Sequence, residues 1–210
     1  MPVMLGVNAV ELLCSRLCHD LVSPVAAINN GVELMEEVGG GTDEALDLIA
    51  DSAAQAARRL KMFRLAFGAA GSQAVLPPQD VRAVLEGWAR GTKIKVEWAA
   101  DNLASATVRG IFKLMLLVAL LAEEALHHGG RFRIESTGEG GLRLLVEGRG
   151  GGLREEARAA LSTDVSDAAL TQRNIVAHFA ARTAEHHGLS LTIIQSDAER
   201  TVIVIGPKAA

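Results

Sequence analysis

The chain has 210 residues, with 25 acidic and 21 basic side chains and a formal net charge of -4. This balance, without a run of lysines or arginines, argues against a nucleic-acid partner, because such partners require a basic surface that neutralises phosphates. Hydrophobic residues make up 49% of the chain but aromatic residues only 3%, which favours packed helices over an all-β core.

The first predicted element is a long amphipathic helix from about Val7 to Val38. No basic region followed by an apolar run precedes it, so we predict no signal peptide and expect a cytoplasmic chain. His19 lies roughly 200° around the helix from Leu17 and Leu21, so we expect it to face water. The apolar side chains that form one stripe at helical spacing are Val10, Leu13, Leu17, Leu21, Val25, Ile28, Val32 and Met35.

The neighbours of His19 favour a functional histidine over the more common case of a solvated surface histidine. Asp20 can hold one tautomer of the imidazole or take its proton, and Ser23 follows one turn later on the same face. Pro24 falls inside the helix, where it removes a backbone hydrogen bond to residue 20. The sequence therefore indicates a nucleophilic imidazole that is presented on the helix surface.

The only two cysteines, Cys14 and Cys18, stand four residues apart on this helix. A metal site that includes the adjacent His19 is one interpretation, but His19 projects about 100° away from Cys18 and no fourth ligand is evident. We expect buried cysteines in a reducing compartment, and no bound metal.

A second long helix follows a predicted glycine turn at 39–41. Thr42 is a suitable N-cap and Gly68 ends the helix. Two long helices joined by a short loop form an antiparallel hairpin, which cannot bury both apolar stripes by itself. We expect a second copy to complete a four-helix bundle, and the alternative is that the rest of the chain covers the stripe. The second stripe comprises Leu46, Ile49, Ala53, Ala56, Ala57, Leu60, Phe63 and Phe67.

After a predicted linker at 68–78, the pattern changes to mixed helices and strands. The most apolar stretch, Ile111 to Ala122, contains Lys113 and is too short to span a bilayer, so no membrane partner is expected. The predicted fold class is α+β, with a helical hairpin followed by an α/β sandwich. Helices are predicted at 80–88, 107–127, 153–161 and 170–187, and strands at 93–98, 131–137, 142–148, 189–195 and 200–206.

The run CHDLVSPVAAINNGVELM, from Cys18 to Met35, resembles the phosphoacceptor helix of ChpT-type histidine phosphotransferases, and its segment HDLVSP resembles the H-box of histidine kinases. The resemblance implies a bacterial multi-step phosphorelay in which phosphohistidine at His19 carries a phosphoryl group between receiver-domain aspartates. It also implies that Asp20 orients His19 or takes its proton, and that Ser23 supports the site. The implied docking face for receiver domains comprises Arg16, Ala26, Ala27 and Asn30.

The same resemblance implies the domains and the partners. Residues 1–70 would form the dimerisation and phosphotransfer hairpin of a homodimer, and residues 71–210 a domain similar to the ATP-binding domain of histidine kinases. The donor would be the receiver domain of a hybrid kinase of the CckA type, and the acceptors would be response regulators of the CtrA and CpdR types. Magnesium is expected on the receiver domain, and no cofactor on this chain.

The ATP-binding motifs of the kinases are altered in the second half of this chain. The N-box of the kinases has an asparagine that helps hold magnesium, and alignment with Glu124–His128 puts Glu124 in its place, where a carboxylate would repel phosphates. The G1 box has an aspartate that binds adenine, and Gly148 stands there instead. The glycines at 150–152 match no P-loop and predict an ordinary loop. We therefore expect no ATP-dependent kinase activity.

Two alternatives remain open at this point. One is an active histidine kinase with a divergent ATP site. The other, from a different class, is a non-catalytic dimeric scaffold that binds response regulators.

Overall fold

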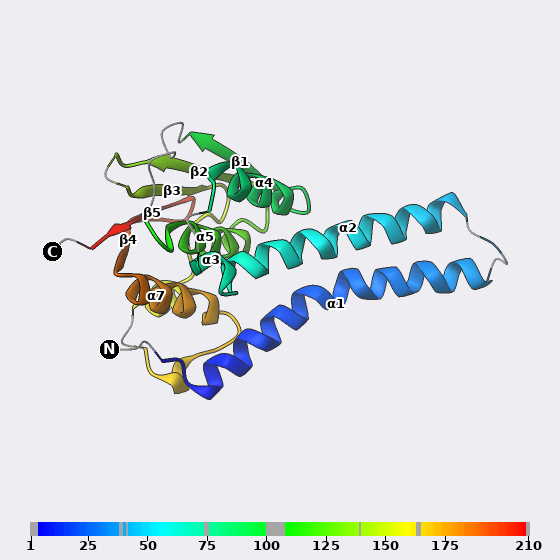
Figure 1. Ribbon diagram of the computed structural model, residues 1–210, viewed down its shortest axis with the longest axis horizontal. Coiled ribbons are helices and arrows are strands. Elements are labelled where there is room, and N and C mark those ends of the chain that lie inside the picture. The colour runs from blue at the N-terminus through cyan, green and yellow to red at the C-terminus, as the bar shows by residue number, and fades with distance from the viewer. Residues whose placement is uncertain are drawn as a thin grey trace.

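The computed structural model describes residues 4–37, 40, 42–73, 76–99, 108–138, 140–162 and 165–208. A long helical hairpin projects from a part that contains one sheet and several helices (Figure 1). This arrangement confirms the predicted α+β class. The helices are α1 (Val7–Glu37), α2 (Asp43–Ala66), α3 (Ala70–Gln73), α4 (Pro78–Ala89), α5 (Ile111–Ala125), α6 (Glu155–Ala160), the 3-10 helix η2 (Asp167–Ala169) and α7 (Ile175–His187). The strands are β1 (Ile94–Ala99), β2 (Gly130–Ser136), β3 (Leu142–Glu147), β4 (Leu189–Ser196) and β5 (Arg200–Pro207).

The two helices α1 and α2 form the predicted antiparallel hairpin. The predicted N-cap of α2 is present, because Oγ1 of Thr42 accepts a hydrogen bond from the backbone N–H of Ala45 at 3.2 Å. Gly31 lets the two helices approach closely, since a Cβ at this position would lie 2.6 Å from Cγ1 of Ile49. The predicted turn at 39–41 lies mostly outside the described residues.

The helix α1 continues through Pro24, which is buried. Proline has no N–H, so the carbonyl of Asp20 loses its usual helical hydrogen bond. Figure 1 shows that α1 is curved rather than straight, and a proline inside a helix is a common cause of such bending. The interruption predicted beside His19 is therefore present as curvature within one continuous helix.

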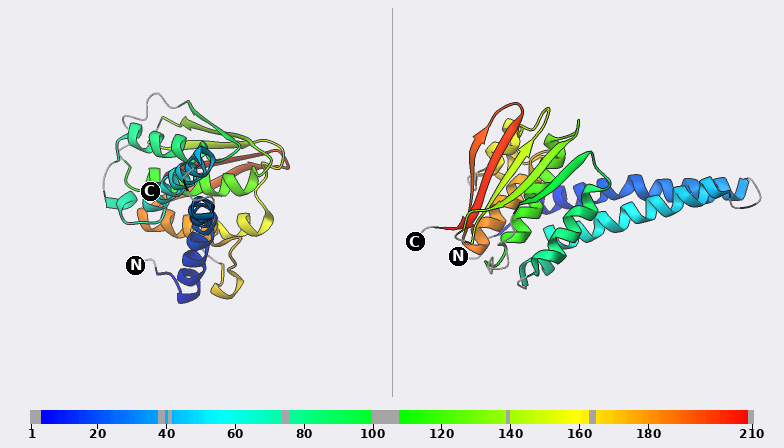
Figure 2. Two further views of the ribbon diagram at one scale, coloured as in Figure 1. Left: turned by 90° about the vertical axis from the view of Figure 1, so that its right-hand side faces the viewer. Right: turned by 90° about the horizontal axis from the view of Figure 1, so that it is seen from above.

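The five strands form one mixed sheet in the order β1-β2-β3-β5-β4. β1 pairs parallel with β2, and the other neighbouring pairs are antiparallel. The helices lie on one side of the sheet (Figure 2), and the buried face that they cover includes Phe132, Ile134, Leu144 and Ile203. All five predicted strands are present, and their ends lie within one residue of the predicted ones.

Three of the predicted segments differ in the structure. Within the described residues, the helix predicted at 107–127 spans only Ile111–Ala125. The segment 68–78, predicted as a linker, contains the short helix α3. The last helix begins at Ile175, five residues later than predicted, because the side chain of Asn174 closes a turn in front of it. Its Oδ1 accepts a hydrogen bond from the N–H of Thr171 at 2.8 Å, and its Nδ2 donates one to the carbonyl of Ala169 at 3.0 Å.

The hydrophobic core is continuous across residue 70. Side chains from the base of the hairpin, including Leu13 of α1 and Phe63 of α2, belong to the same buried cluster as those of α5 and α7. The outer half of the hairpin is not covered, and Val25 and Leu46 are exposed there at 48% and 49%. The second half of the chain therefore covers the apolar stripes only at the base of the hairpin. A second copy of the chain remains the alternative for the outer half.

Both cysteines are exposed, so the prediction of buried cysteines is wrong for the single chain. The side of α1 that packs inside the chain carries Leu13 and Pro24 instead. Among the described residues, no group of three or more histidine, cysteine or acidic side chains could hold a metal ion. In the same part of the chain, no helix is long and apolar enough to cross a membrane.

Lys113 is a buried cation in the first turn of α5, at 5% exposure. Its Nζ donates a hydrogen bond to the carbonyl of Gly68 at 2.8 Å, just beyond the end of α2, where a cation also complements the helix dipole. Burial lowers the pKa of Lys113 from 10.5 to about 8. The folded protein therefore loses this proton at lower pH than the unfolded chain does.

This shift predicts how stability depends on pH. Below pH 8 the charged lysine is buried at a cost, and between pH 8 and 10.5 the unfolded chain binds more of this proton, so stability rises with pH. We expect this rise to contribute roughly 3 kcal/mol. Urea unfolding at pH 7 and pH 10 measures this contribution, as the difference in free energy of unfolding between the unmodified protein and Lys113→Met. Equal differences at both pH values would contradict the prediction.

Candidate phosphotransfer site

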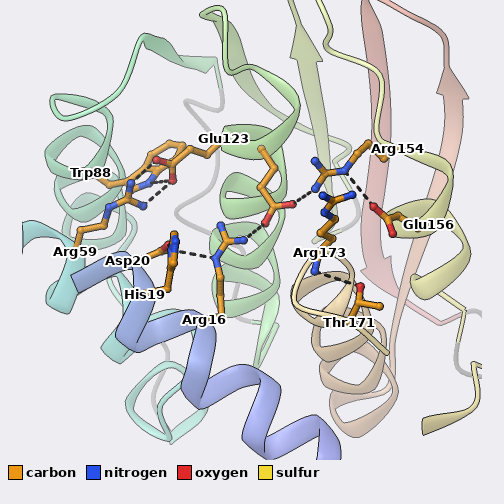
Figure 3. A network of polar contacts seen from close by, with 11 residues as sticks. Arg16, His19, Asp20, Arg59, Trp88, Glu123, Arg154, Glu156, Thr171 and Arg173 are labelled. Carbon is orange, nitrogen blue, oxygen red and sulfur yellow. Dashed lines mark hydrogen bonds and ion pairs between the residues drawn. The ribbon is translucent and has the colours of Figure 1, made fainter. Parts of the chain in front are cut away.

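His19 is presented on α1 as the sequence predicts. Its side chain is 80% exposed, and its Nδ1 lies 3.3 Å from Oδ1 of Asp20 (Figure 3). When Nδ1 carries the proton that this carboxylate accepts, Nε2 keeps its lone pair and faces away from Asp20. The pair therefore offers one imidazole nitrogen as a nucleophile at the protein surface.

The Asp20 carboxylate is fixed from its other side by Arg16. Asp20 is largely buried, with 14% of its side chain exposed, and its Oδ2 lies 3.3 Å from Nε of Arg16, one helical turn earlier. The guanidinium of Arg16 points towards α5, where its Nη1 lies 2.9 Å from Oε1 of Glu124. Arg16 thus binds two carboxylates, one on its own helix and one on α5.

Glu124 is placed between two guanidiniums near the end of α5. Its second oxygen, Oε2, accepts a hydrogen bond from Nη2 of Arg154 at 2.9 Å, and Nε of Arg154 lies 3.6 Å from Oε1 of Glu156. Burial raises the pKa of Glu124, and the charges of Arg16 and Arg154 oppose this shift.

A second polar cluster lies next to Asp20 and ties α2 and α4 to α5 (Figure 3). The guanidinium of Arg59 binds the carboxylate of Glu123 through two hydrogen bonds, one of them at 2.7 Å from Nη1 to Oε2. The indole Nε1 of Trp88 donates to the same oxygen at 3.0 Å. This bidentate pair adds a polar link to the apolar core that already packs α5 against the base of the hairpin.

The predicted docking residues fall into two groups. Ser23, Ala26 and Asn30 are exposed and share the face of His19, since they follow it by four, seven and eleven residues. Ala27 is half-buried, and Arg16 is held by Asp20 and Glu124 rather than free on the surface. The exposed members form a surface of small side chains beside the imidazole.

The glycine-rich loop at 148–152 is packed against the turn between β4 and β5. A Cβ at Gly151 would lie 2.6 Å from the carbonyl oxygen of Glu199, and a Cβ at Gly152 would lie 2.1 Å from that of Asp197. At Gly148, where the kinase motif has its aspartate, a Cβ would lie 2.8 Å from the carbonyl oxygen of Gly129. These glycines allow close backbone packing, which supports the prediction of an ordinary loop.

The cavity beside this loop is small. It has a volume of about 10 Å³, whereas binding sites for small molecules measure roughly 300–1,000 Å³. Glu124, which was predicted to repel phosphates, forms ion pairs with two arginines through its two oxygens. The residues that line the cavity are Leu121, Glu124, Ala125, Leu153, Arg154 and Ala157.

Sequence reasoning missed the partners of the His19–Asp20 pair. It placed Arg16 on the docking face and Glu124 in an altered nucleotide motif, and did not single out Arg154. No local pattern connects α1 with α5, because the contact depends on how the hairpin packs on the rest of the chain. The unusual charge at Glu124, next to a long apolar run, was the one available signal.

This fold and this site define a protein that presents one exposed histidine, paired with a carboxylate, on a helical hairpin. A family model described as the histidine phosphotransferase C-terminal domain matches residues 78–199. The protein phosphotransferase ChpT of Brucella abortus (strain 2308) is 39% identical over 140 residues, which span 66% of this chain and 66% of that protein. The chain belongs to the histidine phosphotransferase family.

Two solved structures are also similar. The 1.7 Å structure of a bacterial phosphotransferase matches with a TM-score of 0.78 and 31% identity, covering 98% of this chain and 100% of that chain. The histidine kinase AdeS of Acinetobacter baumannii matches more weakly, with a TM-score of 0.46 and 11% identity, covering 89% of this chain and 95% of that one.

Proposed function

We propose that this protein carries phosphoryl groups on His19 between the aspartates of receiver domains in a phosphorelay. The observation that carries the proposal is the imidazole of His19, which is 80% exposed while its Nδ1 faces the carboxylate of Asp20. Membership of the histidine phosphotransferase family supports the same reaction.

The reaction needs one nucleophile and one orienting carboxylate from this chain. Nε2 of His19 attacks the phosphorus of an aspartyl phosphate, the N–P bond forms, and the P–O bond to the aspartate breaks, so that the aspartate leaves as a carboxylate. The imidazole becomes a phosphoimidazolium, and its Nδ1–H donates to Asp20, whose charge stabilises it. The aspartate of a second receiver then attacks the phosphorus, and the N–P bond breaks. The receiver supplies the magnesium ion.

Small side chains beside His19 suit the approach of a receiver domain. Ser23, Ala26 and Asn30 are exposed on this face, so a receiver can bring its aspartyl phosphate close to the imidazole without displacing bulky side chains. Arg16 and Ala27 form the inner border of the proposed docking face. We propose receivers of the CckA, CtrA and CpdR types as the partners, as the resemblance of the first helix implies.

We further propose that the protein transfers phosphoryl groups without binding ATP. The small cavity beside the 148–152 loop supports this, and so does Glu124, which occupies the space there with its two arginine contacts. An active kinase would need an adenine site, and the close backbone contacts of Gly148 leave no space for the aspartate that would bind the base.

Incubation with two phosphoryl donors tests the proposal. We expect the purified protein to take label from a phosphorylated receiver domain and none from labelled ATP. Label from ATP would establish a kinase instead, and no label from either donor would leave a scaffold that binds receivers without transfer.

A second copy of this chain is the proposed partner of the exposed outer half of the hairpin. Val25 and Val32 of α1 are 48% and 43% exposed, and Leu46 and Leu60 of α2 are 49% and 53% exposed. Members of the first pair are seven residues apart, and those of the second are fourteen apart, with Ala53 midway. Heptad spacing of this kind is typical of helices that pack in a bundle. Two hairpins would bury these residues against each other as a four-helix bundle.

Charges introduced into this stripe should separate the dimer. We expect the double variant Val25→Glu/Val32→Glu to sediment as a monomer at concentrations at which the unmodified protein is a dimer, because each carboxylate would be buried without a partner. The matched control is Leu48→Glu, since Leu48 is 41% exposed but lies off the heptad positions, and it should remain dimeric. Analytical ultracentrifugation measures the difference, and an equally dimeric double variant would contradict the proposal.

A further inference from the structure

We propose that Glu124 of α5 is a positioning residue for His19, acting through Arg16 and Asp20. This inference rests on the proposed function. It gives the second half of the chain a part in phosphoryl transfer without any nucleotide. The acceptor histidine would then be oriented partly by a residue from a different element, far along the chain.

The contacts form an unbroken path from α5 to the imidazole. Glu124 Oε1 lies 2.9 Å from Arg16 Nη1, Arg16 Nε lies 3.3 Å from Asp20 Oδ2, and Asp20 Oδ1 lies 3.3 Å from His19 Nδ1. The side chains of Glu124, Arg16 and Asp20 are 13%, 26% and 14% exposed, so water competes little for these contacts. Only His19, at the end of the path, is open to solvent.

Arg16 would hold Asp20 weakly without Glu124. An ion pair between residues four apart on a helix surface restrains a long, flexible side chain only slightly. Here the planar guanidinium of Arg16 has two partners: its Nε contacts Asp20 of α1, and its Nη1 contacts Glu124 of α5. Two partners on different helices remove most of the conformational freedom of the side chain. The Asp20 carboxylate then has one oxygen fixed by Arg16, and its other oxygen is directed to Nδ1 of His19.

Arg154 favours the ionised form of Glu124, because its charge opposes the rise in pKa that burial causes. A buried carboxylate with one arginine partner would keep one oxygen unsatisfied, but Oε2 of Glu124 accepts a hydrogen bond from Arg154 at 2.9 Å. Each oxygen of Glu124 is thus paired with one arginine. By the resemblance to the kinase N-box, Glu124 stands where an asparagine helps hold a nucleotide-bound metal ion, and here it binds Arg16 of α1 instead.

The test compares two neighbouring carboxylates of α5. Glu124→Gln removes the charge with little change in shape. Glu123→Gln makes the same change one residue earlier, in the cluster with Arg59 and Trp88, which makes no contact with Arg16. Two quantities are measured: the single-turnover rate of transfer from a saturating phosphorylated receiver, and the ¹⁵N spectrum of the His19 ring, which reports the nitrogen that carries the proton.

For Glu124→Gln we expect a rate lower by about tenfold, with unchanged receiver affinity and a smaller fraction of His19 protonated on Nδ1. Glu123→Gln should match the unmodified protein in both measurements. An unchanged rate or ring spectrum in Glu124→Gln, or an equal loss in Glu123→Gln, overturns the proposal. If the unmodified protein accepts no phosphoryl group, the proposed function is wrong. The positioning of His19 by Glu124 is then still tested by the ring spectra, because these need no receiver domain.

Discussion

Replacing His19 with alanine is expected to abolish phosphoryl transfer in both directions. In the proposed reaction the imidazole is the nucleophile, and the neighbouring Asp20 carboxylate is already paired with Arg16. We expect the rate of label transfer from a phosphorylated receiver to fall by at least about 1,000-fold. Because the side chain is 80% exposed, the substitution should leave the free energy of unfolding within about 0.5 kcal/mol.

The matched control is His186→Ala. His186 is also exposed, but it lies at the end of α7, and its replacement should leave transfer unchanged. Label on the unmodified protein should be lost in acid and retained in alkali, because the N–P bond of phosphohistidine is acid-labile and alkali-stable. Undiminished label on His19→Ala would show that another residue accepts the phosphoryl group and would contradict the proposed mechanism.

Asp20→Asn is expected to have the second-largest effect. The amide keeps the shape of the side chain, but it can donate an N–H to Nδ1 of His19, which moves the imidazole proton to Nε2 and blocks the nucleophilic nitrogen. The neutral amide also no longer stabilises the phosphoimidazolium. We expect the single-turnover rate of transfer to fall by about 100-fold, within the range that orienting and acid–base groups usually contribute.

The control for Asp20→Asn is Asp47→Asn. Asp47 is exposed on α2, so this substitution removes one negative charge from the hairpin at a distant position. The spectrum of the His19 ring should show the proton on Nε2 in Asp20→Asn and on Nδ1 in Asp47→Asn. Transfer by Asp20→Asn within threefold of the unmodified rate would show that Asp20 has no orienting role.

The order and the type of the main elements could be predicted well from the sequence. The strands β1 to β5 end within one residue of their predicted ends, because alternation and turn residues are local signals. The outward position of His19 could also be predicted, since it follows from the helical period alone. The short helix α3 and the turn closed by Asn174 could not, because each depends on a few hydrogen bonds that leave no periodic pattern.

The residues around the site divide in the same way. The pairing of His19 with Asp20 and the nearness of Ser23 depend on positions within one or two helical turns, so the sequence by itself determined them. The contacts of Arg16 with Glu124 and of Glu124 with Arg154 join α1, α5 and the segment before α6, and the exposure of both cysteines depends on which side of α1 packs inside. Only the tertiary structure decided these features, because helical periodicity says which residues share a face but not which distant element that face will meet.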